Sequence, residues 1–205
     1  MTPRKYKMTK RAAAIEATRD RIVEATVAAH RDLGIQATSW DEIARRAGVG
    51  VGTVYRHFRS LDELLPACGE LVARTLALPD RKQLSGLFDG ARSTRQRIDR
   101  LVGEVFDLYE RGAPFVENIR REREELPDLE RWHREIEEVL DALTREALQP
   151  AEPDERGIAV VRALIDLSTW SAFKERGLTS EQTVQTIAEL IQCSLWPARR
   201  REYRQ

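Results

Sequence analysis

The stretch AGVGVGTVYRHF, residues 47–58, combines three glycines with a cluster of hydrogen-bond donors. The donors are Thr53, Tyr55, Arg56 and His57. Hydroxyl and imidazole groups can donate to phosphate oxygens, and a guanidinium can also pair with O6 and N7 of guanine. Such a set predicts contact with a polyanion.

The three glycines have different expected roles. Gly48 can adopt the left-handed conformation that ends a helix, and Gly50 is an acceptable N-cap for the next one. Gly52 falls in the first turn of that helix, where the missing side chain lets another molecule's phosphate approach the backbone closely. Val51 offers no hydrogen bond but can contact a thymine methyl group.

Two short helices are predicted on either side of Gly48. The first begins at Ser39, where SWDE predicts a capping box, and the second runs from Gly50 or Val51 to Phe58. A short helix, a turn and a second short helix form a helix-turn-helix, whose second helix enters the DNA major groove. An ordinary helical hairpin with a solvated polar face is the alternative.

The rest of the chain is predicted to be helical, because apolar residues recur with helical spacing and no run alternates with period two. Further helices are expected at 17–33, 61–78, 94–111, 114–126, from 127, at 158–173 and from 179. The fold class is therefore all-α. The expected domains are a helix-turn-helix domain at 15–65, preceded by a basic arm at 1–14, a linking helix at 61–78, and a second helical domain at 79–198.

Charge is distributed unevenly although the formal net charge is zero. Residues 1–61 contain 12 Lys and Arg against 6 Asp and Glu, and the remainder contains 22 against 28. A basic first third predicts a nucleic-acid-binding module joined to a different domain, with chance scatter of surface charge as the alternative. The basic arm can lie along phosphates or the minor groove, or be a solvated tail.

The segment TSWDEIARRAGVGVGTVYRHFRSLDELL resembles the signature of the TetR family of bacterial transcriptional regulators, at motif level over residues 19–65. The resemblance implies an all-helical homodimer that binds a palindromic operator in double-stranded DNA and represses until a small molecule enters its second domain. It implies phosphate contacts from Ser39, Thr53, Tyr55 and His57. It places near base edges Val51, Gly52 and Arg56.

Three positions depart from the family's pattern. Family members often carry a basic residue where this chain has Asp41 and a lysine where it has Leu61, and both contact phosphate. The nearby residues that can replace them are Arg45, Arg46 and Arg59. His30 stands where the family commonly has an apolar aromatic residue, and we interpret it as a core histidine with a local partner rather than a switch.

The second domain is expected to bind a mainly apolar or aromatic effector and to form the dimer. The aromatic residues expected to line its cavity, or else to fill its core, are Phe106, Tyr109, Phe115, Trp132, Trp170 and Phe173. Excess apolar surface on the last two helices predicts a four-helix dimer interface, with a monomer core as the alternative. The residues expected there are Ile158, Val161, Ile165, Ile187, Leu190 and Ile191.

Rival functions have weaker support. ERWH, residues 130–133, is a single Glu-x-x-His pair, whereas a di-iron bundle needs two pairs and further glutamates. No catalytic triad, nucleotide-binding loop or C-x-x-C is recognisable, so neither an enzyme nor a cofactor or metal is expected. A helical protein-interaction module with degraded DNA binding remains the alternative. The absence of a long apolar run predicts no membrane span, and the two cysteines suit a cytoplasmic protein.

Overall fold

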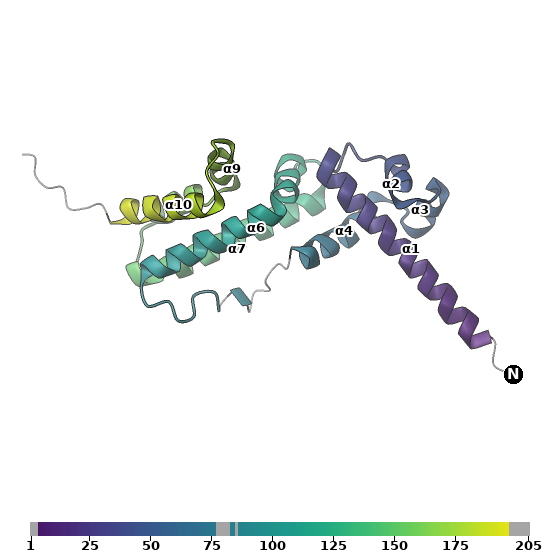
Figure 1. Ribbon diagram of the computed structural model, residues 1–205, viewed down its shortest axis with the longest axis horizontal. Helices are drawn as coiled ribbons and strands as arrows, with labels where there is room; N and C mark the ends of the chain where they lie inside the picture. Colours follow the sequence, from purple (N-terminus) through teal and green to yellow (C-terminus); the bar gives the residue numbers. More distant parts are fainter. Residues whose placement is uncertain (1–3, 77–82, 85, 197–205) are drawn as a thin grey trace, which may run out of the picture. The chain divides into compact units, whose positions relative to one another are not determined.

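The fold was analysed in a computed structural model, which describes residues 4–76, 83–84 and 86–196. Within these residues all regular structure is helical (Figure 1). The helices are α1 (Arg4–Leu33), α2 (Trp40–Ala47), α3 (Val51–His57), α4 (Leu61–Thr75), α6 (Thr94–Glu122), α7 (Pro127–Leu148), the 3₁₀ turn η1 (Gln149–Ala151), α8 (Glu155–Leu164), α9 (Leu167–Glu175) and α10 (Ser180–Leu195). None of the helices described is long and apolar enough to cross a membrane.

The chain divides into two compact units. The first comprises Met1–Leu78 with Asn118–Glu130, and the second comprises Pro79–Glu117 with Arg131–Gln205. In the first unit, apolar side chains from α1, α2, α3 and α4 form one core. Its members are Ile22, Val23, Ala25, Ile43, Ala44, Ala47, Val54, Phe58, Leu64, Ala67 and Cys68. Because these residues face inward, they determine which sides of α2 and α3 lie at the surface of the protein.

Helix α1 is longer than the sequence predicted. It begins at Arg4 instead of residue 17, so most of the expected basic arm continues the helix. Residues 12–14 are consecutive alanines, the residue with the highest helix propensity, and they allow the helix to extend beyond the part that packs on the core. Residues 1–3 of the arm lie outside the described residues.

A buried polar cluster holds the turn between α1 and α2. The Glu122 carboxylate is 8% exposed and accepts hydrogen bonds from the backbone N–H groups of Ile35 (3.0 Å) and Gln36 (2.8 Å). The Asn118 side chain donates to the carbonyl oxygen of His30 (2.7 Å). Residues nearly ninety positions apart in the sequence therefore fix this turn.

His30 is 5% exposed, as expected of a core histidine. Its Nε2 atom has no hydrogen-bond partner within the described residues, although the prediction included a local partner. Burial lowers the pKa of His30 to about 4, and the negative charge of Glu122 opposes that shift. The imidazole is therefore neutral at physiological pH.

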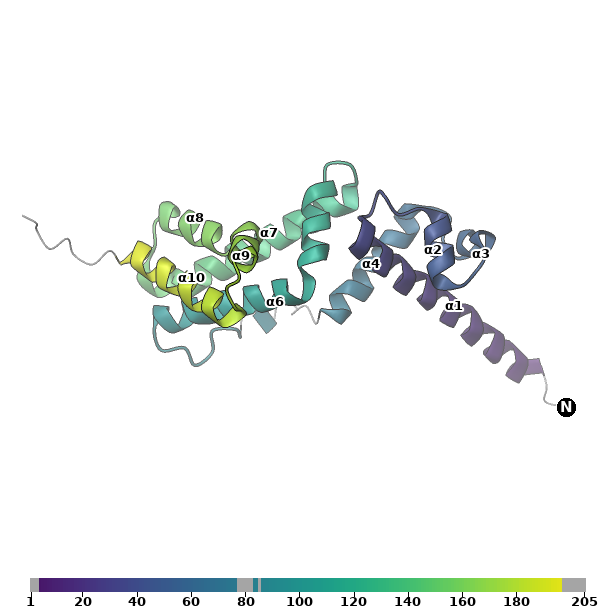
Figure 2. The ribbon, with the colours of Figure 1, turned by 45° about the horizontal axis from the view of Figure 1, so that its top comes forward.

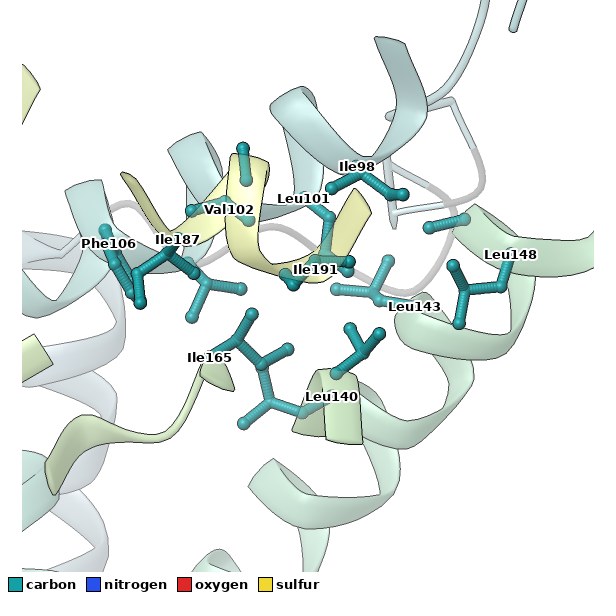
Figure 3. Packing of buried hydrophobic residues seen from close by; sticks show 14 of the residues in the cluster. Ile98, Leu101, Val102, Phe106, Leu140, Leu143, Leu148, Ile165, Ile187 and Ile191 are labelled. Carbon is teal, nitrogen blue, oxygen red and sulfur yellow. The ribbon is translucent and has the colours of Figure 1, made fainter. Parts of the chain in front are cut away.

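The second unit has its own core, built from α6, α7, α8, α9 and α10 (Figure 3). Figure 3 shows side chains from different helices converging, among them Ile98, Leu101, Leu143, Ile165 and Ile191. All five are at most 7% exposed. The apolar stripes predicted from helical spacing thus meet in a single contiguous core.

Two further predicted helix boundaries are wrong. Helix α6 continues through Pro114, where the sequence predicted a break and a new first turn. An interior proline costs a helix about 3 kcal/mol, and packing on both sides of it outweighs that local cost here. Conversely, the expected helix at 158–173 is two helices, α8 and α9, which Figure 2 shows separately. Asp166 starts the second by accepting a hydrogen bond from the N–H of Ser168 (2.8 Å).

The capping box predicted at Ser39 is only partly formed, and the same holds at the start of α4. The hydroxyls of Ser39 and Ser60 accept from the backbone N–H groups of Glu42 (3.2 Å) and Glu63 (3.3 Å). The reciprocal bonds are absent in these two helices: Glu42 binds arginines instead, and Glu63 accepts from the N–H of Arg59. At α10 the capping box formed by Thr179 and Gln182 is complete.

Candidate nucleic-acid interface

The turn between α2 and α3 presents one side of α3 to solvent. Gly48 ends α2 with φ of 65°, the left-handed conformation that the sequence predicted. Val54 and Phe58 are at most 2% exposed and anchor α3 in the first unit's core. The remaining residues of α3 therefore point away from the core or lie at its edge.

Hydrogen-bond donors occupy that outer side. Tyr55 is 47% exposed, Arg56 is exposed, and Thr53 and His57 are half-buried. The Arg56 guanidinium donates to the Thr53 hydroxyl (2.9 Å). Because that hydroxyl uses a lone pair to accept, its own proton stays available for an external acceptor.

Gly52 has no steric role inside the protein. A Cβ atom built at this position meets no atom within 4 Å, and its φ is not in the left-handed region. Alanine would favour the helix by about 1 kcal/mol, so glycine here is locally unfavourable. The missing side chain leaves space outside the protein for another molecule's backbone.

Val51 differs from its expected placement. It is half-buried and packs against the first unit's core, whereas the sequence predicted that it points outward. An apolar side chain at the first position of α3 stabilises the folded protein, because it shields the neighbouring core residues from water. Only part of Val51 is left for contact with a base.

Trp40 was not predicted as a site residue. Its ring stacks on that of Tyr55, with centroids 4.9 Å apart and planes 27° apart. Trp40 also packs against the core, so it holds the Tyr55 ring in place from α2. Sequence spacing gave no sign of this pair, because it depends on how α2 crosses α3.

The arginines expected to replace the missing basic positions differ in availability. Arg46 pairs with Glu42 (2.6 Å) and Asp32 (2.7 Å), and its side chain is 20% exposed. Arg45 also pairs with Glu42 (2.6 Å) but is 69% exposed. These arginines, through hydrogen bonds above all, lower the pKa of Glu42 to about 2. Arg59 is exposed, like Asp41, while Leu61 is half-buried.

The aromatic residues expected around an effector lie mainly in the second unit's core. Tyr109 is 3% exposed and donates its hydroxyl to the carbonyl oxygen of Ile165 (3.2 Å). Its ring lies 6.1 Å from that of Phe106 and 5.9 Å from that of Trp170. Half-buried positions are occupied by Phe115, Trp132, Trp170 and Phe173. Of the six predicted aromatics, Phe106 alone is among the described residues that line the groove between α6 and α10.

The residues expected at a dimer interface are mostly internal. Five of the six are at most 6% exposed inside the protomer: Ile158, Val161, Ile165, Ile187 and Ile191. They pack on α6 and α7, so their apolar surface is already covered without a partner. Leu190, which is 44% exposed, is the exception.

In the part of the chain that the structure describes, no three or more His, Cys, Asp or Glu side chains come together in a way that could hold a metal ion. Cys68 and Cys193 are free thiols.

Comparison with known proteins connects this geometry to a family. Residues 22–68 match the family of bacterial regulatory proteins described as the tetR family. The HTH-type transcriptional repressor KstR of Mycobacterium tuberculosis is 28% identical over 155 residues, which are 73% of this chain and 66% of that protein.

Solved structures share the fold along most of the chain. A transcriptional regulator from Rhodococcus sp. Rha1 is 18% identical and superposes with a TM-score of 0.63, covering 87% of this chain and 96% of that one. The regulator FadR from Bacillus subtilis, solved with stearoyl-CoA, is 18% identical with a TM-score of 0.57, covering 83% and 96%. The curated relative is named a transcriptional repressor, and residues 22–68 of this chain match the tetR family of bacterial regulatory proteins.

Proposed function

We propose that this regulator binds a palindromic operator as a homodimer, through the outer side of α3, and represses transcription until a small molecule binds its second unit. The observation that carries the DNA-binding part is the group of exposed or half-buried donors on α3 beside the open backbone of Gly52. A surface of this kind fits a phosphate backbone, because phosphate oxygens are hydrogen-bond acceptors and the polar groups on this side of α3 are donors.

The donors have two proposed tasks, contact with phosphates and contact with bases. Thr53, Tyr55 and His57 donate to phosphates and fix the register of α3 in the major groove. Arg56 extends from the same helix and either pairs with guanine or binds a phosphate. Ser39 is exposed. Its hydroxyl oxygen accepts a hydrogen bond from the backbone N–H of Glu42, and its proton stays available for a phosphate.

Arg45 and Arg59 are the proposed substitutes for the basic residues that Asp41 and Leu61 do not supply. Both are exposed, whereas Arg46 is held by two carboxylates. Since Arg45 shares Glu42 with Arg46, a phosphate at this position competes with an exposed ion pair, which is a weak interaction. We expect Arg45 to turn toward DNA and Arg46 to stay in place.

Dimerisation is proposed to use the exposed edge of α10. Leu190 and Trp196 are 44% and 47% exposed, which is high for large apolar residues. Cys193 lies between them and is also exposed. In a two-fold dimer a residue near the axis faces its own copy. A short bis-maleimide should therefore link two chains through Cys193, and sedimentation should give twice the chain mass.

Cys68 is an internal control for that experiment. It is buried, and burial raises the pKa of its thiol to about 12, so it should not react in the folded protein. Cys193→Ser should abolish the linked product, and Cys68→Ser should leave it unchanged. Sedimentation as a monomer at micromolar concentration would overturn the proposed dimer.

The proposed response to an effector is supported by the relatives. KstR is named a repressor, and the FadR structure contains stearoyl-CoA, a ligand with a long apolar chain. By analogy, the effector of this regulator is a small molecule with an apolar body. It acts only insofar as it binds the DNA-free arrangement more tightly than the DNA-bound one.

Selection of bound fragments from genomic DNA, followed by affinity measurements, tests the DNA-binding proposal. Arg56→Ala should weaken binding to a selected fragment by about 1–3 kcal/mol, or roughly 5- to 150-fold. Arg134→Ala, an exposed arginine on α7, is the control that removes the same charge elsewhere. Failure to enrich any fragment, or equal weakening by both substitutions, would overturn the proposed interface.

A further inference from the structure

Helices α6 and α10 enclose a groove in the second unit. The two helices run in opposite directions: the Ser180 hydroxyl donates to Glu110 (2.6 Å) at one end, and the Gln192 side chain donates to Asp99 (3.2 Å) at the other. The groove between these links has a volume of about 540 Å³. Figure 2 shows α10 lying along α6. Along α6, the two ends are eleven positions apart, or about 16 Å of helix.

The floor of the groove is apolar and is hollow because its central residues are small. Gly103 on α6 lies among the lining residues with Ala188 on α10, the half-buried Val184 adds apolar surface, and Phe106 closes the floor from below with 2% of its surface exposed. A Cβ atom at Gly103 would meet no atom within 4 Å, so the space above it is open. A narrow apolar chain therefore fits the floor without displacing a side chain.

The rim of the groove is acidic. Five carboxylates line it: Asp99, Asp107, Glu110, Glu181 and Glu189. Among the described lining residues, Arg95 is the one basic side chain. Lys174 pairs with Glu110 (2.8 Å) and Arg111 with Asp107 (3.0 Å) from outside the groove. Even with these two included, carboxylates outnumber basic groups by five to three.

This charge argues against a second copy of the chain as the occupant. If the groove met itself across a two-fold axis, carboxylates would face carboxylates, which is destabilising. Leu190, the exposed apolar residue on α10, is not among the lining residues and sits on another side of the helix. A coenzyme A headgroup would also be repelled, because its phosphates are negative.

We propose that the groove binds a linear organic cation, with an apolar chain over Gly103 and Ala188 and ammonium groups at the carboxylates of the two ends. The carboxylates match the ammonium groups in charge, and the apolar floor matches the chain between them. Small-molecule sites commonly combine an apolar lining with a few polar groups that fix the orientation of the ligand. The assignment of this cation as the effector rests on the proposed function, whereas binding in the groove does not.

Calorimetry with 1,10-diaminodecane on the full chain, without DNA, tests the binding. The matched probes are 1,10-decanediol, which has the same chain and no charge, and decanedioate, which has the opposite charge. We expect the diamine to bind at least about tenfold more tightly than either, and added salt to weaken it alone. Equal binding of diamine and diol, or no binding of the diamine, would overturn the proposal.

Variants locate the site. Glu181→Gln with Glu189→Gln should weaken diamine binding about tenfold, since two surface charge pairs are lost. The control, Glu135→Gln with Glu175→Gln, removes two exposed carboxylates that do not line the groove and should change nothing. Gly103→Leu should block binding with the rim charges intact. Binding that survives both groove variants would place the cation elsewhere.

DNA affinity in the presence of diamine then separates the two proposals. If wild-type protein binds its selected fragment and the diamine weakens that binding, with no such effect in Gly103→Leu, the cation is an effector. If DNA binding is intact and the diamine binds without affecting it, the effector role fails and the site stands. If no fragment is bound at all, the proposed function fails while the calorimetric result is unaffected.

Discussion

The first unit contains two polar regions that differ in how their groups are paired. On the outer side of α3, the Tyr55 hydroxyl and the Arg56 guanidinium lie at the surface, and Gly52 leaves open space beside them. At the turn before α2, the Glu122 carboxylate is buried and accepts from the backbone of Ile35 and Gln36. The polar groups of the first region are available to another molecule, whereas those of the second are bonded to one another within the protein.

This difference separates groups that serve another molecule from groups that hold the fold. Buried donors that lose their acceptor cost free energy, whereas exposed donors are solvated and cost little. Substitutions in the turn should therefore lower stability, and substitutions on α3 should lower DNA affinity with stability retained. Each prediction below challenges one side of that contrast.

The largest effect is expected at Glu122. Glu122→Ala leaves the N–H groups of Ile35 and Gln36 without their acceptor, and should lower the free energy of unfolding by about 3–4 kcal/mol. Urea unfolding measures the loss, and hydrogen exchange should show faster exchange at these two amides. Glu122→Gln keeps one acceptor oxygen and should lose about half as much.

Glu124→Ala is the matched control for Glu122→Ala. Glu124 lies two residues further along the chain, is exposed, and should change stability by less than about 0.5 kcal/mol. If both variants lost the same stability, the buried carboxylate would have no special role. The contrast between the two polar regions would then fail on its structural side.

The next effect is a dependence of stability on pH through His30. The folded-state pKa is lowered from 6.5 to about 4, so between these values the unfolded chain binds a proton that the folded chain does not. Stability is therefore full above about pH 6.5 and falls as the pH drops toward 4. Between pH 7.5 and 5 the loss should be about 2 kcal/mol, measurable by urea unfolding.

His30→Phe removes the titrating group and should flatten that part of the pH profile. A wild-type slope retained in His30→Phe would mean that other groups cause the acid sensitivity.

The sequence predicted one of these regions and not the other. The residues of α3 lie within a dozen positions, so helical spacing and the turn at Gly48 were enough to identify its outer side except at Val51, which packs against the core. Glu122 and Ile35 are 87 positions apart, and nothing in their local sequence indicates that they meet. Trp40 beside Tyr55 and the groove between α6 and α10 were missed for the same reason.

Helix boundaries failed where a local rule was outweighed. The break predicted at Pro114 did not occur because packing holds α6 together on both sides of the proline. The single helix predicted at 158–173 is interrupted because Asp166 caps a new helix, a side-chain bond that periodicity does not reveal. The apolar stripes themselves were predicted well. Helical spacing does not indicate, however, whether a stripe is covered by this chain or by a partner chain.

On α3, Gly52→Ala should separate folding from DNA binding. The Cβ has room inside the protein, so stability should hold or rise by up to about 1 kcal/mol. DNA affinity should fall at least about tenfold, or 1.4 kcal/mol, because the methyl group intrudes where a phosphate backbone approaches.

Gly103→Ala provides the comparison for Gly52→Ala, because a Cβ there also meets no atom within 4 Å and the residue lies in another helix. It should gain similar helix stability without any change in DNA affinity. Unchanged DNA binding in Gly52→Ala would show that the open space beside α3 is not used by DNA.

The smallest effect concerns the stack of Trp40 on Tyr55, and a double-mutant cycle on DNA affinity is needed to measure it. Tyr55→Phe keeps the ring and removes the hydroxyl, while Trp40→Ala removes the support of that ring. If Trp40 acts by aiming the hydroxyl at a phosphate, its loss should cost less once the hydroxyl is gone, with a coupling of about 0.5–1 kcal/mol. Trp40→Phe should restore most of the affinity. Additive effects would instead mean that Trp40 does not act through the Tyr55 hydroxyl. Trp40 would then belong with the residues that hold the fold, and Tyr55 would contact DNA without its support.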